Sequence, residues 1–536
     1  MASVSKKTGI QHPDSARVLR EIVLREHLRI YDEKLPDIIA GRDGFASGTV
    51  HVQEAMDRVR DASRAVAQNI LSGYVDGMKG LRRYADMERI AGQKRKWSVP
   101  KFMGRYGYEL SQGIRIWLMT PDAVSETLPL IMGDFDLLVF DEASQMFAER
   151  GIPSIFRSKK TVVAGDHKQL RPSSLGRGRL SYDEDEDAAE NGSLLDLARS
   201  RYISVLLNYH YRSENPALID FSNRAFYGGR LLVAPDTGNG GKAIEVVRTD
   251  GVWEERTNRA EAEKAVSLLR EILTARKDGE TVGIIAFNIH QMNLISDILE
   301  SECAADRGFG RIVALEESRR DNGEDVGLFV KNVESVQGDE RDIVIFSMGY
   351  AKDRDGKFSR KFGWLNADGG PNRLNVAITR ARKKVVILQS FDPEWLGERD
   401  MSGPGLLRRY LEYAACVSSG DTEGAEAALA SLSPAPKVPG NDVFARMLAE
   451  KLTAEGFGVR TDVPLPAILT AYRQGSRPIA FFRDSDSWNM GGSARERIVH
   501  RRRFLISRGW KVEDIWSSDA DKEPEKEIER LLKNVL

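Results

Sequence analysis

Cysteine is scarce in this sequence of 536 residues, and long apolar runs are missing from it. Only Cys303 and Cys416 occur, which excludes a disulfide scaffold or a cysteine-rich zinc site and fits a reducing cytoplasm. No run reaches the roughly 18 to 20 apolar residues that a membrane span needs. The N-terminus lacks the apolar stretch of a secretory signal. We therefore expect a cytoplasmic protein.

An excess of one charge is also missing. Lys and Arg number 79 and Asp and Glu number 80, for a formal net charge of −1. Net charge therefore says nothing about a polyanionic partner, which only a local patch could attract. Hydrophobic residues make up 41% of the chain, which excludes disorder as the dominant state. At roughly 150 residues per domain, the length predicts three to four domains.

The pattern of apolar residues changes along the chain. Residues 1–110 are charged, with apolar positions at helical spacing, and predict helices. From about residue 114, short apolar runs alternate with helical patterns. These runs are IRIWLMT (114–120), FDLLVFDE (135–142), KTVVAGD (160–166), TVGIIAFN (281–288), DIVIFSMGY (342–350) and KKVVILQS (383–390). Apolar strands separated by helices indicate parallel sheets covered on both faces, and so an α/β architecture.

Two segments interrupt this pattern. The acidic run at 183–187 predicts a solvated loop. The proline-rich stretch at 433–440 predicts a semi-rigid linker. The residues after it, 441–536, have their own helical and apolar runs, and we expect them to form a small separate domain.

Two adjacent carboxylates follow one of the predicted strands. The strand at 137–140 leads directly into Asp141 and Glu142, and ligands of open α/β sheets bind beyond the carboxyl ends of strands. Mg²⁺ prefers oxygen ligands and shares them with phosphates, so Asp141 could hold the ion while Glu142 polarises a water molecule. The alternative is a helix N-terminus that favours acidic residues.

A glutamine and two arginines add to this pattern. Gln169 follows the strand at 161–164, and its amide could both donate to a γ-phosphate and accept from an attacking water. Arg212 and Arg380 are suited to stabilise a phosphoryl transition state. Each alone could be an ordinary surface residue. Together with the carboxylates they suggest a nucleotide clamped between two α/β units.

In their order, these blocks closely resemble the motifs of superfamily 1 helicases, nearest to the group of the nonsense-mediated-decay helicase and large bacterial relatives. The segments that carry the resemblance are IWLMTPDAVSETL (116–128), DEASQ (141–145), GDHKQLRPS (165–173), HYRSEN (210–215), TVGIIAFNIHQ (281–291), VESVQGDERD (333–342) and NVAITRAR (375–382). The resemblance implies tandem RecA-like folds, ATP and Mg²⁺ as cofactors, and a single strand of DNA or RNA as partner.

Carried over position by position, the resemblance implies a role for each matching residue. Asp141 would coordinate Mg²⁺, Glu142 would activate water and Gln169 would sense the γ-phosphate. The remaining expectations are Arg212 and Arg380 as arginine fingers, Gly338 and Glu340 toward the nucleotide, and Thr120, Pro121 and Ser335 toward the nucleic acid. No role is assigned to Gln291.

The phosphate-binding loop of that family is missing. No GxxxxGK[ST] occurs in the sequence, so the backbone N–H groups that would cradle the phosphates are absent. Three explanations stay open: a separate polypeptide completes the first RecA-like domain, the chain is truncated, or it is a degenerate scaffold that does not hydrolyse ATP. A half-built sheet leaves an edge open for pairing, which favours a protein partner.

The last 95 or so residues resemble the restriction-endonuclease-like domain, related to very-short-patch-repair nucleases, that ends many bacterial relatives. The resemblance rests on RPIAFFRDS (477–485), ARER (494–497), RGWKV (508–512) and IWSS (515–518). Phe482 occupies the position of the metal-binding Glu, and Asp462 is the only nearby candidate for a second carboxylate. Since metal-dependent cleavage needs carboxylate ligands, we predict an inactive nuclease fold. Arg495 and Arg497 could still bind phosphates, or they could lie on a solvated helix face.

The resemblance divides the chain into five parts. They are a helical insertion of the first RecA-like domain (1–110), the C-terminal part of that domain (111–204), a second RecA-like domain (205–398), a helical segment with the linker (399–440) and the endonuclease-like domain (441–536). The predicted function is an ATP-dependent helicase or translocase subunit or fragment, in DNA repair or phage defence. The alternative is a non-catalytic nucleic-acid-binding scaffold.

Overall fold

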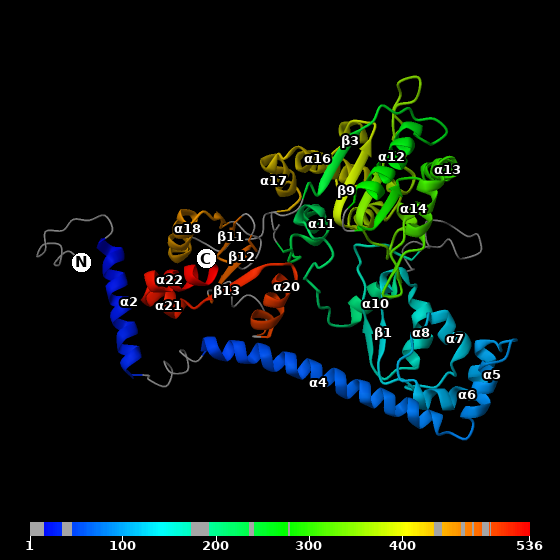
Figure 1. Cartoon of the computed structure of the whole chain (residues 1–536), viewed down its shortest axis with the longest axis horizontal. Coiled ribbons are helices and arrows are strands. Elements are labelled where there is room, and N and C mark those ends of the chain that lie inside the picture. Colours follow the sequence, from blue (N-terminus) through cyan, green and yellow to red (C-terminus); the bar gives the residue numbers. More distant parts are fainter. Residues whose placement is uncertain are drawn as a thin grey trace, which may run out of the picture.

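The computed structural model describes residues 15–34, 45–172, 192–234, 241–276, 279–433, 442–461, 467–473, 476–484, 493 and 495–536. The acidic run 183–187, most of the proline-rich linker and Asp462 lie outside the described residues. The fold class is α/β with parallel sheets, as predicted, and is consistent with tandem RecA-like lobes (Figure 1). No helix in the described ranges is long and apolar enough to cross a membrane.

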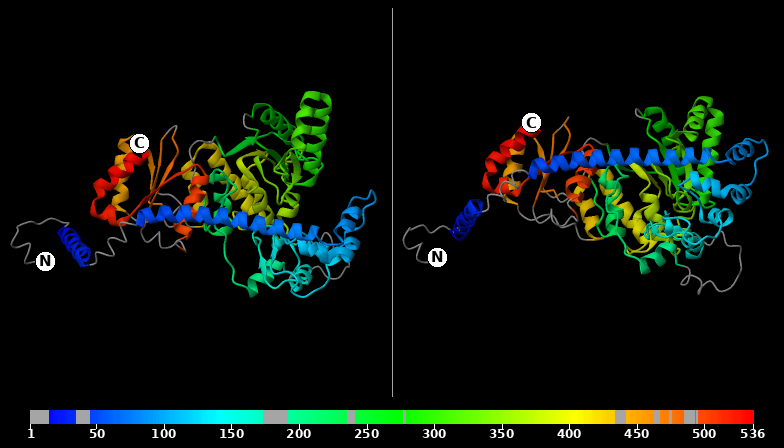
Figure 2. Two further views of the ribbon diagram at one scale, coloured as in Figure 1. Left: turned by 60° about the horizontal axis from the view of Figure 1, so that its bottom comes forward. Right: turned by 90° about the horizontal axis from the view of Figure 1, so that it is seen from below.

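The N-terminal part is helical. Its elements are α2 (Ser15–Lys34), α4 (Phe45–Lys79), α5 (Tyr84–Ala91) and α6 (Val99–Gly113). Helix α4 has 35 residues and runs from the C-terminal domain at one end to α5 and α6 at the other (Figure 2). Its middle, residues 58–70, is exposed on every side. Helix α4 therefore connects two distant parts of the molecule.

The first lobe (residues 114–202) has a small two-stranded sheet. Its elements are α7 (Pro121–Thr127), β1 (Leu138–Phe140), α8 (Ala148–Phe156), β2 (Thr161–Val163) and α10 (Leu194–Arg201). Strands β1 and β2 are parallel, with Val139 opposite Val162. The predicted strand at 114–120 is wrong as a strand: this segment is not helical and pairs with no strand among the described residues. An apolar run becomes a β-strand only where a neighbour accepts its backbone hydrogen bonds.

The second lobe (residues 208–433) contains a five-stranded parallel sheet in the order β3-β9-β8-β4-β7. The strands are β3 (Ile244–Arg248), β4 (Val282–Ala286), β7 (Phe329–Asn332), β8 (Arg341–Ser347) and β9 (Ala381–Gln389). Helices α12 (Arg259–Ala275), α13 (Ile289–Ala305) and α14 (Arg307–Glu317) share one core with the sheet. Helices α11 (Asp220–Tyr227), α15 (Gly370–Ile378), α16 (Gly403–Ser419) and α17 (Thr422–Ala430) share the other. The apolar strands are thus covered on both faces.

The C-terminal domain (residues 442–536) has a four-stranded sheet in the order β10-β11-β12-β13. Its strands are β10 (Gly458–Arg460), β11 (Leu469–Tyr472), β12 (Ile479–Arg483) and β13 (Lys511–Ile515). Only the pair β12 and β13 is parallel. Helices α18 (Val443–Ala454), α21 (Ser517–Lys522) and α22 (Pro524–Val535) contribute to one core. The short π-helix η7 (Glu496–His500) continues into α20 (Arg501–Ser507), which packs in the other.

Candidate nucleotide site between the two lobes

Asp141 and Glu142 lie at the carboxyl end of β1. The Glu142 N–H donates to Asp141 Oδ1 at 2.9 Å, and Glu142 has φ 52°. That left-handed conformation is uncommon for a residue with a side chain and is typical of functional turns. The Ala143 N–H donates to the carbonyl of Ala164 at 2.9 Å, which fixes this turn against the end of β2. Both carboxylates therefore lie in a turn that is fixed at the carboxyl end of β1.

Glu142 reaches across to the second lobe. Gln337 Nε2 donates to Glu142 Oε2 at 3.1 Å, and Gln145 Nε2 donates to the same oxygen at 3.4 Å. Gln337 lies in the motif at 333–342, and no role was predicted for it. No pattern of spacing could show that it meets a carboxylate 195 positions earlier in the chain. This contact puts the carboxylates of the first lobe directly beside the loop at 333–342.

Arg380 lies buried on the same side of the second lobe, with an exposed fraction of 2%. Its guanidinium donates to the carbonyl of Val376 at 2.6 Å and to Thr379 Oγ1 at 3.1 Å. Burial, and then the positive charge of Arg212, lower the pKa of Arg380 to about 10, while Glu340 and Glu142 act to raise it. Arg380 therefore stays protonated at neutral pH, with Glu142 near enough to interact with its charge.

Arg212 is paired with a neighbour from the loop that precedes β8. Its Nε donates to Glu340 Oε2 at 2.5 Å. Gly338, two residues earlier, has φ 86°, and no heavy atom lies within 4 Å of the position that a Cβ would take. Glu340 was expected to face the nucleotide; the structure gives it Arg212 as its ion-pair partner. The two predicted arginines and both loop residues nevertheless lie in one region.

Gln169 and its neighbours form the second contact between the lobes. Gln169 Nε2 donates to Asp166 Oδ2 at 3.0 Å, and the Tyr227 hydroxyl donates to the same oxygen at 2.5 Å. Burial, and then the Asp166 charge, raise the pKa of Tyr227. Tyr227 belongs to the second lobe, so Asp166 joins a residue of each lobe.

Two asparagines of α15 complete this contact. Asn372 Nδ2 donates to the carbonyls of His167 and Gln169, at 3.1 Å and 2.8 Å. Asn375 Nδ2 donates to the carbonyl of Lys168 at 2.8 Å and to the Tyr227 hydroxyl at 3.1 Å. Asn375 begins the motif at 375–382 and Asn372 lies three residues before it, and no role was predicted for either. They position the loop that carries Gln169.

The residues expected to face nucleic acid are engaged locally. Thr120 Oγ1 accepts from the Ala123 N–H at 3.3 Å as the N-cap of α7, which begins at Pro121. Ser335 Oγ donates to Asn332 Oδ1 at 2.6 Å. None of these contacts brings them into the group around Glu142. Their predicted role stays a prediction.

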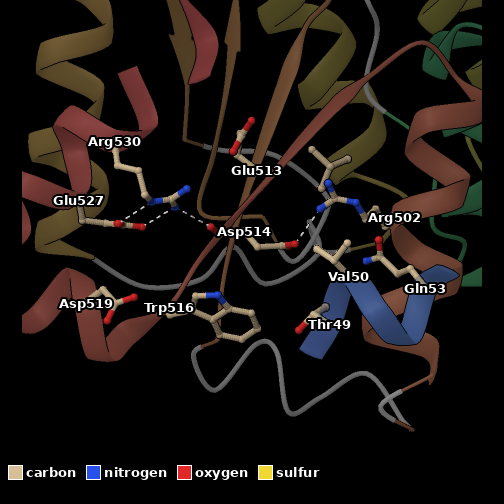
Figure 3. A pocket seen from close by; sticks show the side chains of 11 residues that line it. Thr49, Val50, Gln53, Arg502, Glu513, Asp514, Trp516, Asp519, Glu527 and Arg530 are labelled. Atoms are coloured by element: carbon tan, nitrogen blue, oxygen red, sulfur yellow. Dashed lines mark hydrogen bonds and ion pairs between the residues drawn. The ribbon is translucent and has the colours of Figure 1, made fainter. Parts of the chain in front are cut away.

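In the C-terminal domain, Phe482 is buried beside Trp510 and Leu505. Near β13, a pocket holds carboxylates that are paired with arginines, as Figure 3 shows: Asp514 with Arg502 at 2.7 Å, and Glu527 with Arg530 at 2.6 Å. Burial raises the pKa of Asp514. Within the described ranges, no group of three or more His, Cys, Asp and Glu could hold a metal ion.

The arginines predicted to bind phosphate on the C-terminal domain differ in exposure. Arg495 is exposed, whereas Arg497 is partly buried. Downstream, Arg501 is buried, Arg502 pairs with Asp514 and Arg503 pairs with Asp57. Most of this basic run therefore packs within the protein, and the phosphate-binding role stays a prediction for Arg495 and Arg497.

Comparison with known proteins finds one matching family model and several similar proteins. Residues 239–391 match the family described as an AAA domain. The chain is 31% identical over 423 residues to the "Uncharacterized ATP-dependent helicase MG140" of Mycoplasma genitalium, covering 75% of this chain and 37% of that protein. It is 26% identical over 280 residues to the "Regulator of nonsense transcripts 1 homolog" of Neurospora crassa, covering 47% and 22%. A solved structure, "Crystal structure of Arterivirus nonstructural protein 10 (helicase)", aligns at 13% identity over 58% of this chain and 57% of that one, with a TM-score of only 0.25.

The matching relatives thus carry the names of an ATP-dependent helicase and of a regulator of nonsense transcripts, in keeping with the family that the order of motifs resembles. The chain spans less than two fifths of the length of the Mycoplasma helicases that it matches, 37% and 38%.

Proposed function

We propose that this chain is the catalytic part of an ATP-dependent superfamily 1 helicase or translocase that acts on single-stranded nucleic acid. The observation that carries the proposal is the arrangement around Glu142. Gln337 contacts this carboxylate, and the charges of Glu142 and Glu340 both act on the buried Arg380. Glu142 of the first lobe thus lies near enough to the Arg380 guanidinium of the second lobe for their charges to interact, as a triphosphate between two lobes requires.

The residues present fit ATP and Mg²⁺. Asp141 offers carboxylate oxygen at the end of β1, and a single carboxylate suffices where phosphate oxygens supply further ligands. When bound, Mg²⁺ would neutralise charge on the phosphates. Glu142 would orient and deprotonate the attacking water, Gln169 would contact the γ-phosphate, and Arg212 and Arg380 would stabilise the charge that develops on it.

The first lobe also needs the missing phosphate-binding loop, from an N-terminal portion or a partner. Apolar residues of 114–119 and 203–207 are exposed to an unusual degree: Leu118 at 94%, Ile203 at 96% and Leu207 at 86%. No backbone hydrogen bond joins 203–207 to another segment of the described chain. Val139 of β1 and Val162 of β2 are themselves 57% and 50% exposed. An apolar surface with unpaired backbone is typical of a sheet that another strand completes.

Mixing the chain with a segment that carries the phosphate-binding loop tests whether the first lobe needs that loop. The full chain should hydrolyse ATP, with stimulation by single strands, only when a separately produced segment with a strand followed by GxxxxGK[ST] is added. Leu207→Asp should block assembly because a buried unpaired charge is strongly unfavourable. Leu315→Asp is the matched control, since Leu315 is 71% exposed on α14 of the second lobe. No hydrolysis in any mixture, with strand binding intact, would establish the non-catalytic scaffold instead.

The catalytic assignment is tested at Glu142. In the assembled enzyme, Glu142→Gln keeps the shape and the contact with Gln337 but removes the base. We expect kcat to fall by about 10²- to 10⁴-fold, with nucleotide affinity retained in equilibrium binding. Glu149→Gln, an exposed carboxylate in the first turn of α8, is the control. Unchanged turnover in Glu142→Gln would refute the assignment.

A further inference from the structure

The short helical stretch at 496–507, formed by η7 and α20, contacts two parts of the molecule that lie far apart in sequence. We call this stretch the bridge helix. One side of it contacts residues 208–214, which include Arg212 and which we call the arginine segment. Another part of it meets the N-terminal end of α4. The C-terminal domain therefore touches both the arginine segment and the long helix, whatever chemistry its own fold supports.

The contact with the arginine segment is made by Tyr209. Its hydroxyl donates to Glu496 of the bridge helix, and its ring lies against Phe504 with the centroids 4.9 Å apart. Tyr209 is partly buried between them. Arg508, just after the bridge helix, lies close enough to Glu214 for their charges to interact. The C-terminal domain thus contacts one end of the segment and acts on the other by charge, while the backbone of the segment pairs with Leu232 and Arg382 of the second lobe.

The segment between these ends forms a turn that is closed by its own hydrogen bonds. The Ser213 N–H donates to His210 Nε2 at 3.0 Å, and the Ser213 hydroxyl lies 2.9 Å from the same nitrogen. Burial, and then the charges of Arg212 and Arg508, lower the pKa of His210 to about 3, so this ring stays neutral and keeps accepting. A turn closed by these contacts therefore contains Arg212 and directly follows Tyr209 in the chain.

The contacts with α4 tie the same helix to the first lobe. Arg503 pairs with Asp57, and Gln53 Nε2 donates to the carbonyl of Ile498 at 3.0 Å. Figure 3 shows Gln53 on α4 close to Arg502 of the bridge helix. At its other end α4 packs against α6, where the Arg115 guanidinium lies 4.1 Å from the centroid of the Tyr74 ring. Residues 114 and beyond begin the first lobe.

We propose that the C-terminal domain positions Arg212 for the reaction. In this arrangement Glu496 and Phe504 hold Tyr209, Tyr209 sets the place of the turn at 210–213, and the turn directs Arg212 toward Glu340. The bridge helix also fastens this turn to α4, and through α4 to the first lobe. Tyr209 and Glu496 are thus positioning residues. The proposal rests on the proposed role of Arg212 at the nucleotide.

Hydrogen exchange of the full chain tests the contact without any need for hydrolysis. Tyr209→Phe removes the donor and Glu496→Met removes the acceptor of the same hydrogen bond. Each variant should speed exchange of the Ser213 amide by about tenfold, the effect of losing one hydrogen bond. The double variant should exchange no faster than either single one, because both changes break the same bond. Tyr211→Phe, at a ring that is 73% exposed in the same segment, is the control. Exchange as slow as in the wild type would overturn the proposal.

Turnover of the assembled enzyme separates positioning from a merely structural role. Tyr209→Phe and Glu496→Met should lower kcat by about tenfold and leave KM for ATP within about twofold, since Arg212 acts in the transition state. Phe504→Leu should restore most of the kcat that Phe504→Ala loses. Faster exchange with unchanged kcat would overturn positioning. If the wild-type mixture hydrolyses no ATP, the proposed function fails, and the exchange measurement still decides whether the contact holds the turn.

Discussion

Glu261 should make the stability of the second lobe depend on pH. This residue lies in the first turn of α12 and has an exposed fraction of 0%. Its carboxylate accepts hydrogen bonds from the Gly349 N–H at 2.7 Å, Ser390 Oγ at 2.7 Å and Ser347 Oγ at 3.0 Å. Burial raises the pKa of Glu261 to about 7, although these three donors oppose the shift.

Proton binding by Glu261 decides whether the free energy of unfolding rises or falls with pH. The folded state holds the proton of Glu261 up to about pH 7, whereas the unfolded chain loses it near the ordinary value of 4.5. Between these values the folded state binds more protons, so the free energy of unfolding falls as pH rises. A rise of the pKa from 4.5 to about 7 corresponds to a loss of roughly 3 kcal/mol in the free energy of unfolding, present in full above pH 7 and absent below the unfolded pKa. Glu261→Gln, which mimics the protonated form, removes this dependence.

Urea unfolding between pH 4.5 and pH 8 measures the effect. The free energy of unfolding of the wild type minus that of Glu261→Gln should become more negative by up to about 3 kcal/mol across this range. Taking the difference cancels other titrating groups, including buried Asp220, whose pKa burial also raises to about 7. Glu263→Gln, at an exposed residue of the same helix that pairs with Arg259, should show no such trend. A difference that does not vary with pH would refute the reasoning.

Two further substitutions test contacts of the lobes. Tyr227→Phe removes the hydrogen bond to Asp166 and should lower the free energy of unfolding, measured in urea, by about 2 kcal/mol, since hydrogen bonds to charged groups are the stronger ones. Tyr202→Phe, at a ring that is 64% exposed, is the control and should have no effect. Equal losses in both variants would contradict the assignment. Gly283→Ala would place a Cβ 2.4 Å from the Phe329 ring and should cost about 1–3 kcal/mol by overpacking. Gly241→Ala, with nothing within 4 Å, is its control in thermal unfolding, and equal midpoints would contradict the packing argument.

Local sequence pattern predicts much of the second lobe. The run at 281–288 contains β4, which is buried along its whole length, and the run at 383–390 lies largely within β9. A short apolar run bounded by polar residues has few alternatives to a buried parallel strand. The run at 114–120 has the same pattern and forms no strand, because pairing depends on a neighbour that the pattern cannot reveal.

The site is predictable only in part, for a related reason. Asp141, Glu142 and Arg380 could be chosen because a carboxylate or guanidinium after a strand has a recognisable chemical use. Gln337 and Tyr227 could not be chosen, because their roles arise when the two lobes meet, 195 and 61 positions away from their partners. Tertiary contacts of this kind leave no periodic trace in the sequence.

Helix α4 is long enough to convert a small tilt at one end into a large displacement at the other. At 1.5 Å per residue, its 35 residues extend about 50 Å, and nothing in the described chain braces residues 58–70 sideways. A tilt of ~5° at the end that packs on α6 would therefore carry the opposite end by about 4 Å. A displacement of that size exceeds the length of a hydrogen bond. A slight rotation of α6 would thus produce a larger movement at the end of α4 that contacts the C-terminal domain.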